Sequence, residues 1–533
     1  LFFYSLLLGN EEISFIFSRA NLDLKQIQRR LEEKTKILRK GKLKGFSKDF
    51  EETLIEASKI SREKQHERIQ IEEVIIALAR KEKCFEKILI DFDLQVVDFE
   101  NIIFWLESLE RKIEEKKKFW SKENLARSGS LGREWAAGYT VTLDKFSIDL
   151  TKVLKGIIEL IGHKEEIERL ERVLARKEIN NVLLVGEPGT GRKTILQVLA
   201  QKSLFGQCRP EINHKRVVFF DIASLISQTG QNFEPFLEKI FDEVLRTGNV
   251  ILVIDEFQNY VGRLRKPGVI DISGILLKYL RHPEFRFIGI TSPQGLHKHI
   301  EQNPGLETLF EKVEVTEISP REAILVLESL ASYFEKRYKK FISYPALRDI
   351  VNFADRYLPS FSFPKKAIDL LDEAMVYLSA SAKERILLPR HVRKVVSEKI
   401  KIPVGEMESE EREILLNLEY LIHKRIINQD EAVKEVATAM RRARAEISLR
   451  EEPIGCFLFL GPTGVGKTET SKALAEVYFG SEEKMIRLDM SEFQAIEDIP
   501  RLIGSVKQEG LLTTPIRERP FSLILLDEIE KAH

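Results

Sequence analysis

The amino-acid sequence predicts a multidomain protein, with an α-helical repeat domain followed by two α/β modules in which helices cover a parallel sheet. Three observations predict this fold class. A chain of 533 residues is too long for a single hydrophobic core. An apolar pattern with helical spacing occurs twice before residue 110. Further on, continuous apolar strands alternate with amphipathic helices, and this arrangement also occurs twice.

The helical repeat pairs Ser5–Leu24 with Ile75–Leu94 at a constant spacing. The matching positions are Leu8 with Leu78, Phe15 with Phe85, Leu22 with Phe92, and Asp23 with Asp93. Two such repeats stack into a domain that neither forms alone. The apolar opening Leu1–Gly9 is therefore predicted to be a core helix. It lacks a basic leader and is far shorter than the ~20 residues that span a bilayer.

The predicted domains follow from these changes of pattern. They are repeats over 1–109, a linker over 110–142, the large part of the first module over 143–317, its helical small subdomain over 318–402, and the second module over 403–533. The strands of the first module are "NVLLVG", "RVVFFD", "VILVIDE" and "FRFIGIT". Those of the second are "CFLFLG", "KMIRLD" and "SLILLDE". Because the chain lacks a starting Met and stops directly after a predicted buried strand, we interpret it as a fragment at both ends.

Charge and cysteine content narrow the class of protein. Lys+Arg and Asp+Glu are both 84, so no bulk field would attract nucleic acid or an anionic membrane, and we expect neither partner. Cys84, Cys208 and Cys456 are far apart and form no metal-ligand spacing, which favours free thiols in a reducing compartment. These observations predict a cytoplasmic protein.

A phosphate-binding loop follows the first predicted strand of the second module. The loop consists of Gly461, Pro462, Thr463, Gly464, Val465, Gly466, Lys467 and Thr468, and an amphipathic helix follows it. Its glycines let backbone N–H groups and the helix N-terminus face phosphates. Lys467 is placed to reach the outer phosphates and Thr468 to bind Mg²⁺. The predicted cofactors are therefore ATP and Mg²⁺.

Each module also carries an acidic pair at the end of an apolar strand. In the second module Asp527 is predicted to hold the Mg²⁺ shell and Glu528 to act as general base toward an attacking water. Asp255 and Glu256 take the same places in the first module, and Thr291 ends a strand where it could sense the γ-phosphate. A lone acidic pair is usually solvated, but here the apolar strand and the upstream loop favour the functional interpretation.

Several long segments resemble the Clp-type double-module AAA+ ATPases, which are the unfoldase subunits of Clp proteases and the related disaggregases. They include "IGHKEEIERLERVLARKEINNVLLVGEPGTG", "FPKKAIDLLDEA", "LIHKRIINQDEAVKEVATAMRRARA", "PIGCFLFLGPTGVGKTETSKALAE" and "RPFSLILLDEIEKAH". The resemblance runs nearly end to end. It implies homo-hexameric rings that pull polypeptides through a pore, with protein substrates or adaptors docking on the N-terminal repeats and a Clp-type protease as a possible partner.

The resemblance also assigns residues to the adenine base. Ile426 and Ile427 would contact it in the second module, and Leu160 and Ile161 in the first. The stretch Glu373–Pro389 leaves no room for the coiled-coil insertion of disaggregases, which favours the protease-partner branch.

The loop of the first module departs from the family. It consists of Gly186, Glu187, Pro188, Gly189, Thr190, Gly191, Arg192, Lys193 and Thr194. Counted from Gly186, Arg192 stands where the family has its catalytic lysine and Lys193 where it has its Mg²⁺-binding threonine. In the alternative, slipped register, Lys193 and Thr194 form the working pair and the loop has one extra residue. The helix "ILQVLA" keeps the family register, which favours true substitution and weakened hydrolysis.

Further departures concern the family's arginine fingers and pore loops. The paired arginines that reach a neighbour's nucleotide fall here on Thr308 and Leu309. The pore-loop segment "RLIGSVKQEGLLTTP" has no aromatic residue, and only Phe233 lies near the expected place in the first module. Glu256 remains, so the first module is not predicted to be wholly inert.

Three functions follow as hypotheses. The leading one is a Clp-like ATPase that binds ATP at both modules and hydrolyses it mainly at the second, acting in protein quality control or as the regulatory subunit of a Clp-like protease. The second is a diverged nucleotide-dependent scaffold or regulator that does not thread polypeptides. The third, a nucleic-acid-remodelling ATPase, is disfavoured by the zero net charge.

Overall fold

A computed structural model describes most of the chain. The described residues are 11–29, 31, 48–92, 94–118, 140–153, 160–261, 271–359, 361–380, 384–400, 409–446, 453, 455–462, 464–505, 509–519 and 522–533. They divide into two units, one formed by Leu1–Asn352 with Phe361–Pro389 and the other by Phe353–Ser360 with Arg390–His533.

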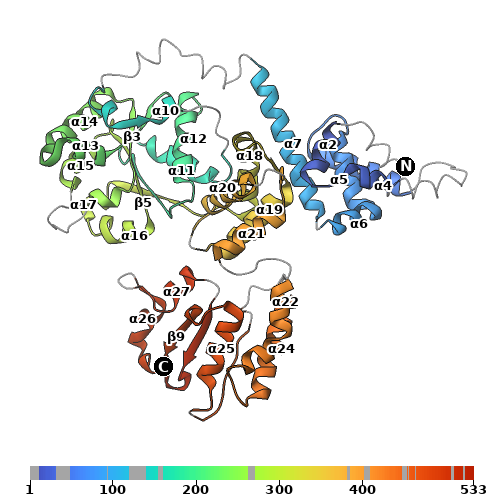
Figure 1. Ribbon diagram of the computed structural model, residues 1–533. Helices are drawn as coiled ribbons and strands as arrows, with labels where there is room; N and C mark the ends of the chain where they lie inside the picture. The colour runs from blue at the N-terminus through green and yellow to red at the C-terminus, as the bar shows by residue number, and fades with distance from the viewer. Residues whose placement is uncertain are drawn as a thin grey trace, which may run out of the picture. The chain divides into compact units, whose positions relative to one another are not determined.

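Helices alone form the described part of the N-terminal domain (Figure 1). They are α2 (Glu11–Arg19), α4 (Lys48–Glu63), α5 (Ile71–Lys81), α6 (Lys83–Asp91) and α7 (Val96–Lys117). Their apolar faces meet in one core, at the centre of which Phe17, Phe85 and Phe99 lie with ring centroids 5.3–6.0 Å apart. The predicted helical domain is confirmed, whereas Leu1–Gly9 lies outside the described residues.

The register predicted for the repeat is wrong by two residues. The backbone N–H of Leu22 donates to the carbonyl of Phe17 after α2, and that of Leu94 donates to the carbonyl of Leu89 after α6. Leu22 therefore corresponds to Leu94, and not to Phe92. Both leucines are buried, while Phe92 is half-buried. The turn that ends each helix determines which residue enters the core, and similarity of residue type in the sequence does not.

The last helix of the repeats is longer than predicted. Helix α7 continues to Lys117, so the predicted linker over 110–142 begins with helical turns. The reason lies in the segment "ERKIEEKK", whose Glu, Lys and Arg side chains are good helix formers. Residues 119–139 lie outside the described part of the chain.

The first module is built on a six-stranded sheet in the order β1-β3-β4-β5-β2-β6. The strands are β1 (Ser147–Asp149), β2 (Asn181–Gly186), β3 (Arg216–Phe220), β4 (Val250–Ile254), β5 (Arg286–Thr291) and β6 (Phe310–Val315). All pairs are parallel except β1 with β3. As predicted, the central strands β2, β4 and β5 are mainly apolar and fully buried.

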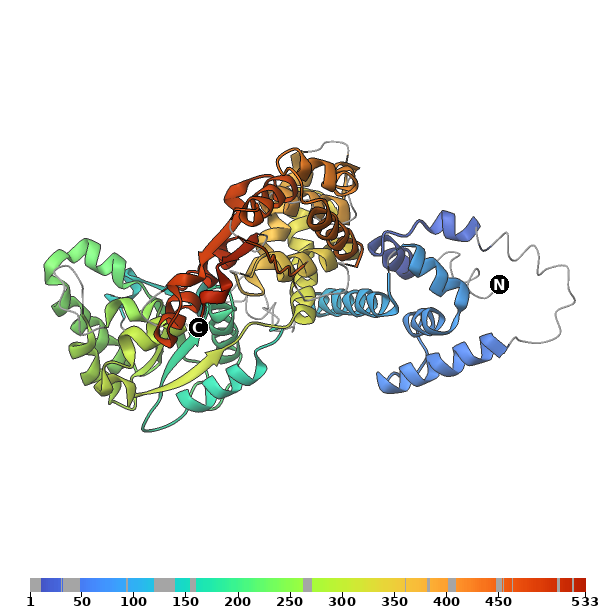
Figure 2. The ribbon, with the colours of Figure 1, turned by 90° about the horizontal axis from the view of Figure 1, so that it is seen from below.

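Helices cover both faces of this sheet (Figures 1 and 2). Successive strand residues such as Leu183 and Leu184 point to opposite faces and enter two different cores. Helices α10 (Leu150–Val153), α11 (Lys164–Leu174) and α12 (Arg192–Leu204) pack on the face of Leu184. Helices α13 (Ile222–Thr229), α14 (Phe233–Thr247) and α15 (Ser273–Leu280) pack on the other. Short helices α16 (Pro293–Gly295) and α17 (Pro304–Glu307) follow β5.

A mainly helical stretch follows the sheet, as predicted. It comprises α18 (Pro320–Tyr338), α19 (Tyr344–Tyr357), α20 (Lys365–Ala380) and α21 (Pro389–Ile400), with a small parallel pair of β7 (Phe341–Ile342) and β8 (Ile386–Leu387). Helix α18 begins with a capping box, in which Ser319 and Glu322 satisfy each other's backbone N–H groups.

The second module contains helices α22 (Ser409–Leu416), α23 (Leu418–His423), α24 (Asp430–Glu446), α25 (Lys467–Phe479), α26 (Ile499–Ile503) and α27 (Thr513–Glu518). Its described strands, β9 (Met485–Asp489) and β10 (Leu523–Asp527), pair in parallel. Helices α22–α25 enclose a core that includes Leu418, Val433 and Leu474. In the described part of the chain, no helix combines the length and the apolar character that crossing a membrane requires.

The strand predicted from "CFLFLG" is not formed. Gly455–Leu460 makes no ladder among the described residues, and Leu458 and Leu460 are 69% and 84% exposed. The equivalent strand of the first module, β2, pairs with β5 and β6, both of which follow the acidic strand in the chain. Among the described residues, the second module contributes only the pair β9 and β10 to its sheet, with no strand in the places of β5 and β6, and β10 is partly buried.

Candidate nucleotide-binding sites

The two phosphate-binding loops end in the same backbone conformation. Gly191 and Gly466 precede their helices with φ of +97° and +100°, in the left-handed region that favours glycine. Helix α12 then begins at Arg192 and α25 at Lys467. The structure thus aligns Arg192 with Lys467 and leaves no extra residue in the first loop, contrary to the slipped register.

The acidic pairs also share one geometry. Glu256 is the second residue after β4 and Glu528 the first after β10, and both adopt a left-handed conformation, with φ of +47° and +53°. Few residues other than glycine adopt this conformation. The chain therefore turns in the same way after both strands; Asp255 directly follows β4 and Asp527 is the last residue of β10, so both carboxylates lie at the carboxyl end of their strand.

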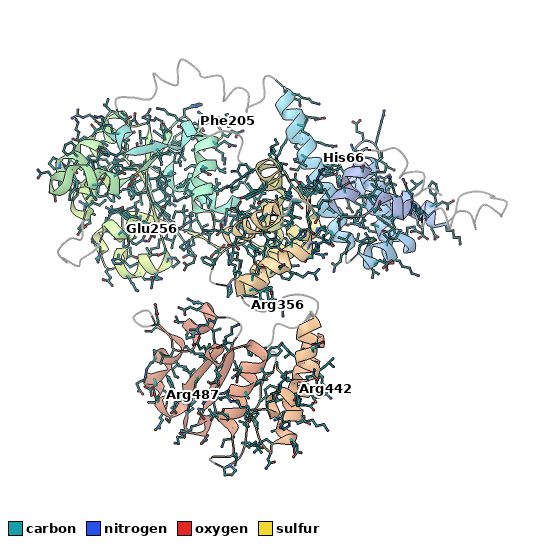
Figure 3. The ribbon with its side chains drawn as sticks, viewed as in Figure 1. His66, Phe205, Glu256, Arg356, Arg442 and Arg487 are labelled. Atoms are coloured by element: carbon teal, nitrogen blue, oxygen red, sulfur yellow. The ribbon has the colours of Figure 1, made fainter. Side chains whose placement is uncertain are left out.

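In the first module, Arg192 extends across the site. Its side chain is 9% exposed, and Nη1 donates a 3.0 Å hydrogen bond to the carbonyl oxygen of Thr291 at the end of β5. Nη2 lies 3.9 Å from Oε1 of Glu256, which Figure 3 marks. The Thr291 hydroxyl donates to the Ser292 carbonyl at 3.2 Å. Arg192 therefore joins the loop helix to β5, and its guanidinium is already bonded within the protein.

Lys193 neutralises the other acidic residue of this site. Its Nζ lies 3.0 Å from Oδ2 of Asp255, and the Lys193 side chain is 69% exposed. An ammonium group has three donors and no acceptor, so it cannot be a metal ligand. The first module thus holds a cation at the position where the loop of the second module has the hydroxyl of Thr468. Its donor set does not fit Mg²⁺.

In the second module, Lys467 folds back on its own loop. Its Nζ donates to the carbonyl oxygens of Gly461 at 2.6 Å and Pro462 at 3.0 Å. Thr463 lies outside the described residues. The hydroxyl of Thr468 and the carboxylate of Asp527 are oxygen ligands of the kind that Mg²⁺ takes beside nucleotide phosphates, so this donor set fits the ion.

Two ion pairs accompany the acidic residues of the second module. Arg487 of β9, marked in Figure 3, lies 2.8 Å from Asp527, and Lys531 lies 2.5 Å from Glu528. Both cationic side chains are at least half-exposed, so these pairs contribute little and can open. The cations come from outside the loop and leave its own Lys467 and Thr468 in place.

The residues assigned to the adenine base differ in exposure. Ile426 is buried in the helical core of its module, whereas Ile427 is 85% exposed. Leu160 and Ile161 are half-buried, and Leu160 packs against the core beneath α11. Of the two isoleucines in the second module, Ile427 is therefore the side chain that is free to contact a base.

Sequence reasoning missed one polar contact that occurs in both modules. Nε2 of His163 lies 2.9 Å from the Thr190 carbonyl, and Nε2 of Gln429 donates to the Val465 carbonyl at 3.0 Å. Each residue stands two places after a predicted adenine contact, and each acceptor directly precedes the last glycine of its loop. The shared spacing was visible in the sequence, but a His and a Gln share no motif.

Other predicted positions lie apart from these sites. Phe233 packs partly buried against the core of the first module, and Leu309 does the same, while Thr308 is exposed. The described residues hold no cluster of His, Cys, Asp or Glu that could by itself bind a metal ion.

Three family models match the chain. The model "ATPase family associated with various cellular activities (AAA)" matches residues 182–337, "AAA lid domain" matches 319–422, and "AAA domain (Cdc48 subfamily)" matches 452–533. The matches fall on the first sheet, on the helical stretch after it, and on the second loop with its acidic strand. They define an AAA-type ATPase with two nucleotide-binding modules.

Individual relatives narrow the class. The "negative regulator of genetic competence ClpC/MecB" of Bacillus subtilis is 36% identical over 464 residues, which cover 74% of this chain and 57% of that protein. The "chaperone protein ClpB" of Oceanobacillus iheyensis is 35% identical over 483 residues, covering 78% and 60%. The chain thus spans less than two thirds of these curated relatives.

Solved structures agree with the relatives. A closed-state cryo-EM reconstruction of Hsp104 with ATPγS and FITC casein is 30% identical, with a TM-score of 0.63, and the match covers 74% of this chain and 69% of that one. The S. cerevisiae Hsp104-ADP complex is 28% identical with a TM-score of 0.58, covering 73% and 69%. The chain belongs to the Clp-type AAA+ ATPases.

Proposed function

We propose that this protein is an ATPase subunit of the Clp type that binds nucleotide at both modules and hydrolyses ATP mainly at the second. Its work would be protein quality control, as a chaperone or as the regulatory subunit of a Clp-like protease. Homo-hexameric assembly, docking of protein substrates or adaptors on the N-terminal repeats, and a cytoplasmic location remain predictions that accompany this proposal.

The observation that carries the proposal is the contrast between the side chains that two similarly ending loops place at the start of α12 and α25. Lys467 and Thr468 keep the groups that bind phosphate and Mg²⁺, whereas Arg192 and Lys193 are bonded to Thr291 and Asp255. Arg is not equivalent to Lys here, because its planar guanidinium is bulkier and makes directed bonds. When bound, Mg²⁺ would neutralise phosphate charge, and Thr468 with Asp527 would hold it.

The residues of the second module divide the remaining work. Lys467, with one exposed and flexible ammonium, can leave the loop carbonyls for the outer phosphates. Glu528 stands directly after Asp527 and can take a proton from the attacking water as general base. The loop N–H groups at the start of α25 orient the phosphates.

Steady-state ATP hydrolysis by the complete protein tests the proposal. Lys467→Ala should abolish hydrolysis, because it removes the ammonium from the working loop. Lys193→Ala should leave most of it, because that ammonium belongs to the loop that already lacks the catalytic pair. Equal losses in the two variants would refute the division of labour.

A scaffold or regulator that does not thread polypeptides is the second candidate. The lack of an aromatic residue in "RLIGSVKQEGLLTTP" favours it, because aromatic side chains grip a chain by apolar and stacking contacts. The packing of Phe233 against its own core points the same way. If the complete protein unfolds a tagged substrate with ATP, this candidate fails.

A further inference from the structure

The ammonium of Lys193 occupies the part of the first module that should hold a metal ion. The residue is the second of α12, as Thr468 is the second of α25, and the glycine before each helix has the same left-handed φ. Its Nζ is 3.0 Å from Asp255, the residue directly after β4. One substitution thus removes a ligand and gives the remaining carboxylate a cationic partner.

The metal and the lysine exclude each other for reasons of charge and coordination. Mg²⁺ requires oxygen ligands at about 2.0–2.1 Å in near-octahedral geometry. Lys193 offers none, and a divalent ion bound to Asp255 would stand close to its positive charge. The neighbouring loop cation, Arg192, is buried and bonded to Thr291, so it does not move aside to relieve this repulsion.

The second module shows that the position of the cation in the chain matters more than its ion pair with the aspartate. Asp527 also has a cationic partner, because Arg487 lies 2.8 Å away. That arginine, however, comes from β9 and is half-exposed, so it can withdraw while Thr468 still supplies a hydroxyl. In the first module the cation belongs to the loop helix itself, so even when this exposed side chain swings away from Asp255 the position offers no hydroxyl to a metal ion.

We infer that the first module binds adenine nucleotides without Mg²⁺, with the Lys193 ammonium taking the place of the metal beside the phosphates. This inference rests on the proposed function, in which the first module holds nucleotide. The loop amides at the start of α12 and the Lys193 ammonium then supply the positive potential that binds the phosphates. Metal-dependent hydrolysis does not occur there, because no metal ion is bound.

The test is nucleotide binding by the full chain carrying Lys467→Ala, which confines the signal to the first module. Binding of the fluorescent analogue mant-ATP is titrated with excess Mg²⁺ and, separately, with EDTA. The expected dissociation constants agree within about twofold. Adding Lys193→Thr should restore metal dependence, with binding weaker in EDTA by about tenfold or more, as for lost metal-site interactions.

Controls keep the outcomes distinct. Lys193 is mostly exposed, so Lys193→Thr should fold, and Lys193→Ser supplies a second hydroxyl variant if it does not. Lys202→Thr, on the same helix, makes the same change of charge away from the loop and should not alter the response to Mg²⁺. Binding that requires Mg²⁺ before any change at Lys193 overturns the inference and leaves the proposed function standing. No binding under either condition overturns both.

Discussion

Arg192 is the residue at which the two modules differ most in what a side chain does. In the second module the aligned lysine bonds only to carbonyls of its own loop. Arg192 instead crosses to the carbonyl of Thr291 and lies near Glu256. The guanidinium of Arg192, which stands where the second module has a phosphate-binding lysine, therefore bridges the loop helix and β5.

Loss of this bridge should cost stability. In Arg192→Ala the buried carbonyl of Thr291 loses its side-chain donor, which we expect to lower the free energy of unfolding of the first module by about 1–3 kcal/mol. Denaturant unfolding of the full chain measures the change. Lys193→Ala is the matched control, because this exposed neighbour should cost less than about 0.5 kcal/mol. Equal costs would show that Arg192 is not a structural bridge.

The sequence predicted these substitutions but not their geometry. Counting from Gly186 was sufficient to align Arg192 with Lys467, because a loop with fixed glycines allows few backbone paths. The direction of the guanidinium depends on where the end of β5 lies, which no local pattern contains. The contacts of His163 and Gln429 could not be predicted for the same reason, since each joins segments that are far apart in the chain.

At the scale of elements, continuous apolar strands were the most reliable signal. Strands β2, β4 and β5 form where the sequence predicts them, because burial on both faces favours runs of apolar residues. The segment "CFLFLG" has the same composition but forms no strand, because a strand also needs neighbours to receive its backbone hydrogen bonds. The predicted register of the repeat was wrong because it matched residues of similar type, whereas the structure aligns the turns that end α2 and α6.

Packing beside α12 should make the thiol of Cys208 unreactive. Burial, and secondly the charge of Glu171, raises the pKa of the Cys208 thiol to about 12. The folded protein therefore keeps this thiol protonated across the range in which an ordinary thiol, with a pKa near 8.5, ionises. The stability gained from the protonated form is present below the ordinary pKa and is lost as the pH rises toward the folded value.

Thiol labelling checks this prediction. At pH 8, a thiol reagent followed by peptide mapping should modify the exposed Cys456 and leave Cys208 unmodified until the first module unfolds, because the thiolate is the reactive form. Denatured chain, in which both thiols are exposed, is the control. Labelling of the two cysteines at equal rates in the folded protein would contradict the account of the packing around α12.

At the scale of the whole molecule, the chain carries two nucleotide-binding modules of one family. In the first, the resemblance to the family places Arg192 at the loop lysine, Lys193 at the Mg²⁺-binding hydroxyl, and Thr308 with Leu309 at the arginine pair. The second keeps its loop and acidic pair, although its pore-loop segment has no aromatic residue. The departures at the nucleotide site of the first module support the proposed division into a nucleotide-holding part and a hydrolysing part.

The matched glutamates test this division most directly. Glu256 and Glu528 share one backbone conformation, so their replacement by Gln is the same change made at two sites. In steady-state ATP hydrolysis by the complete protein, Glu528→Gln should lower the rate by about 10²-fold or more, as expected for a general base, and Glu256→Gln should change it by less than about twofold. A large loss in Glu256→Gln, or full activity in Glu528→Gln, would contradict the assignment of hydrolysis to the second module.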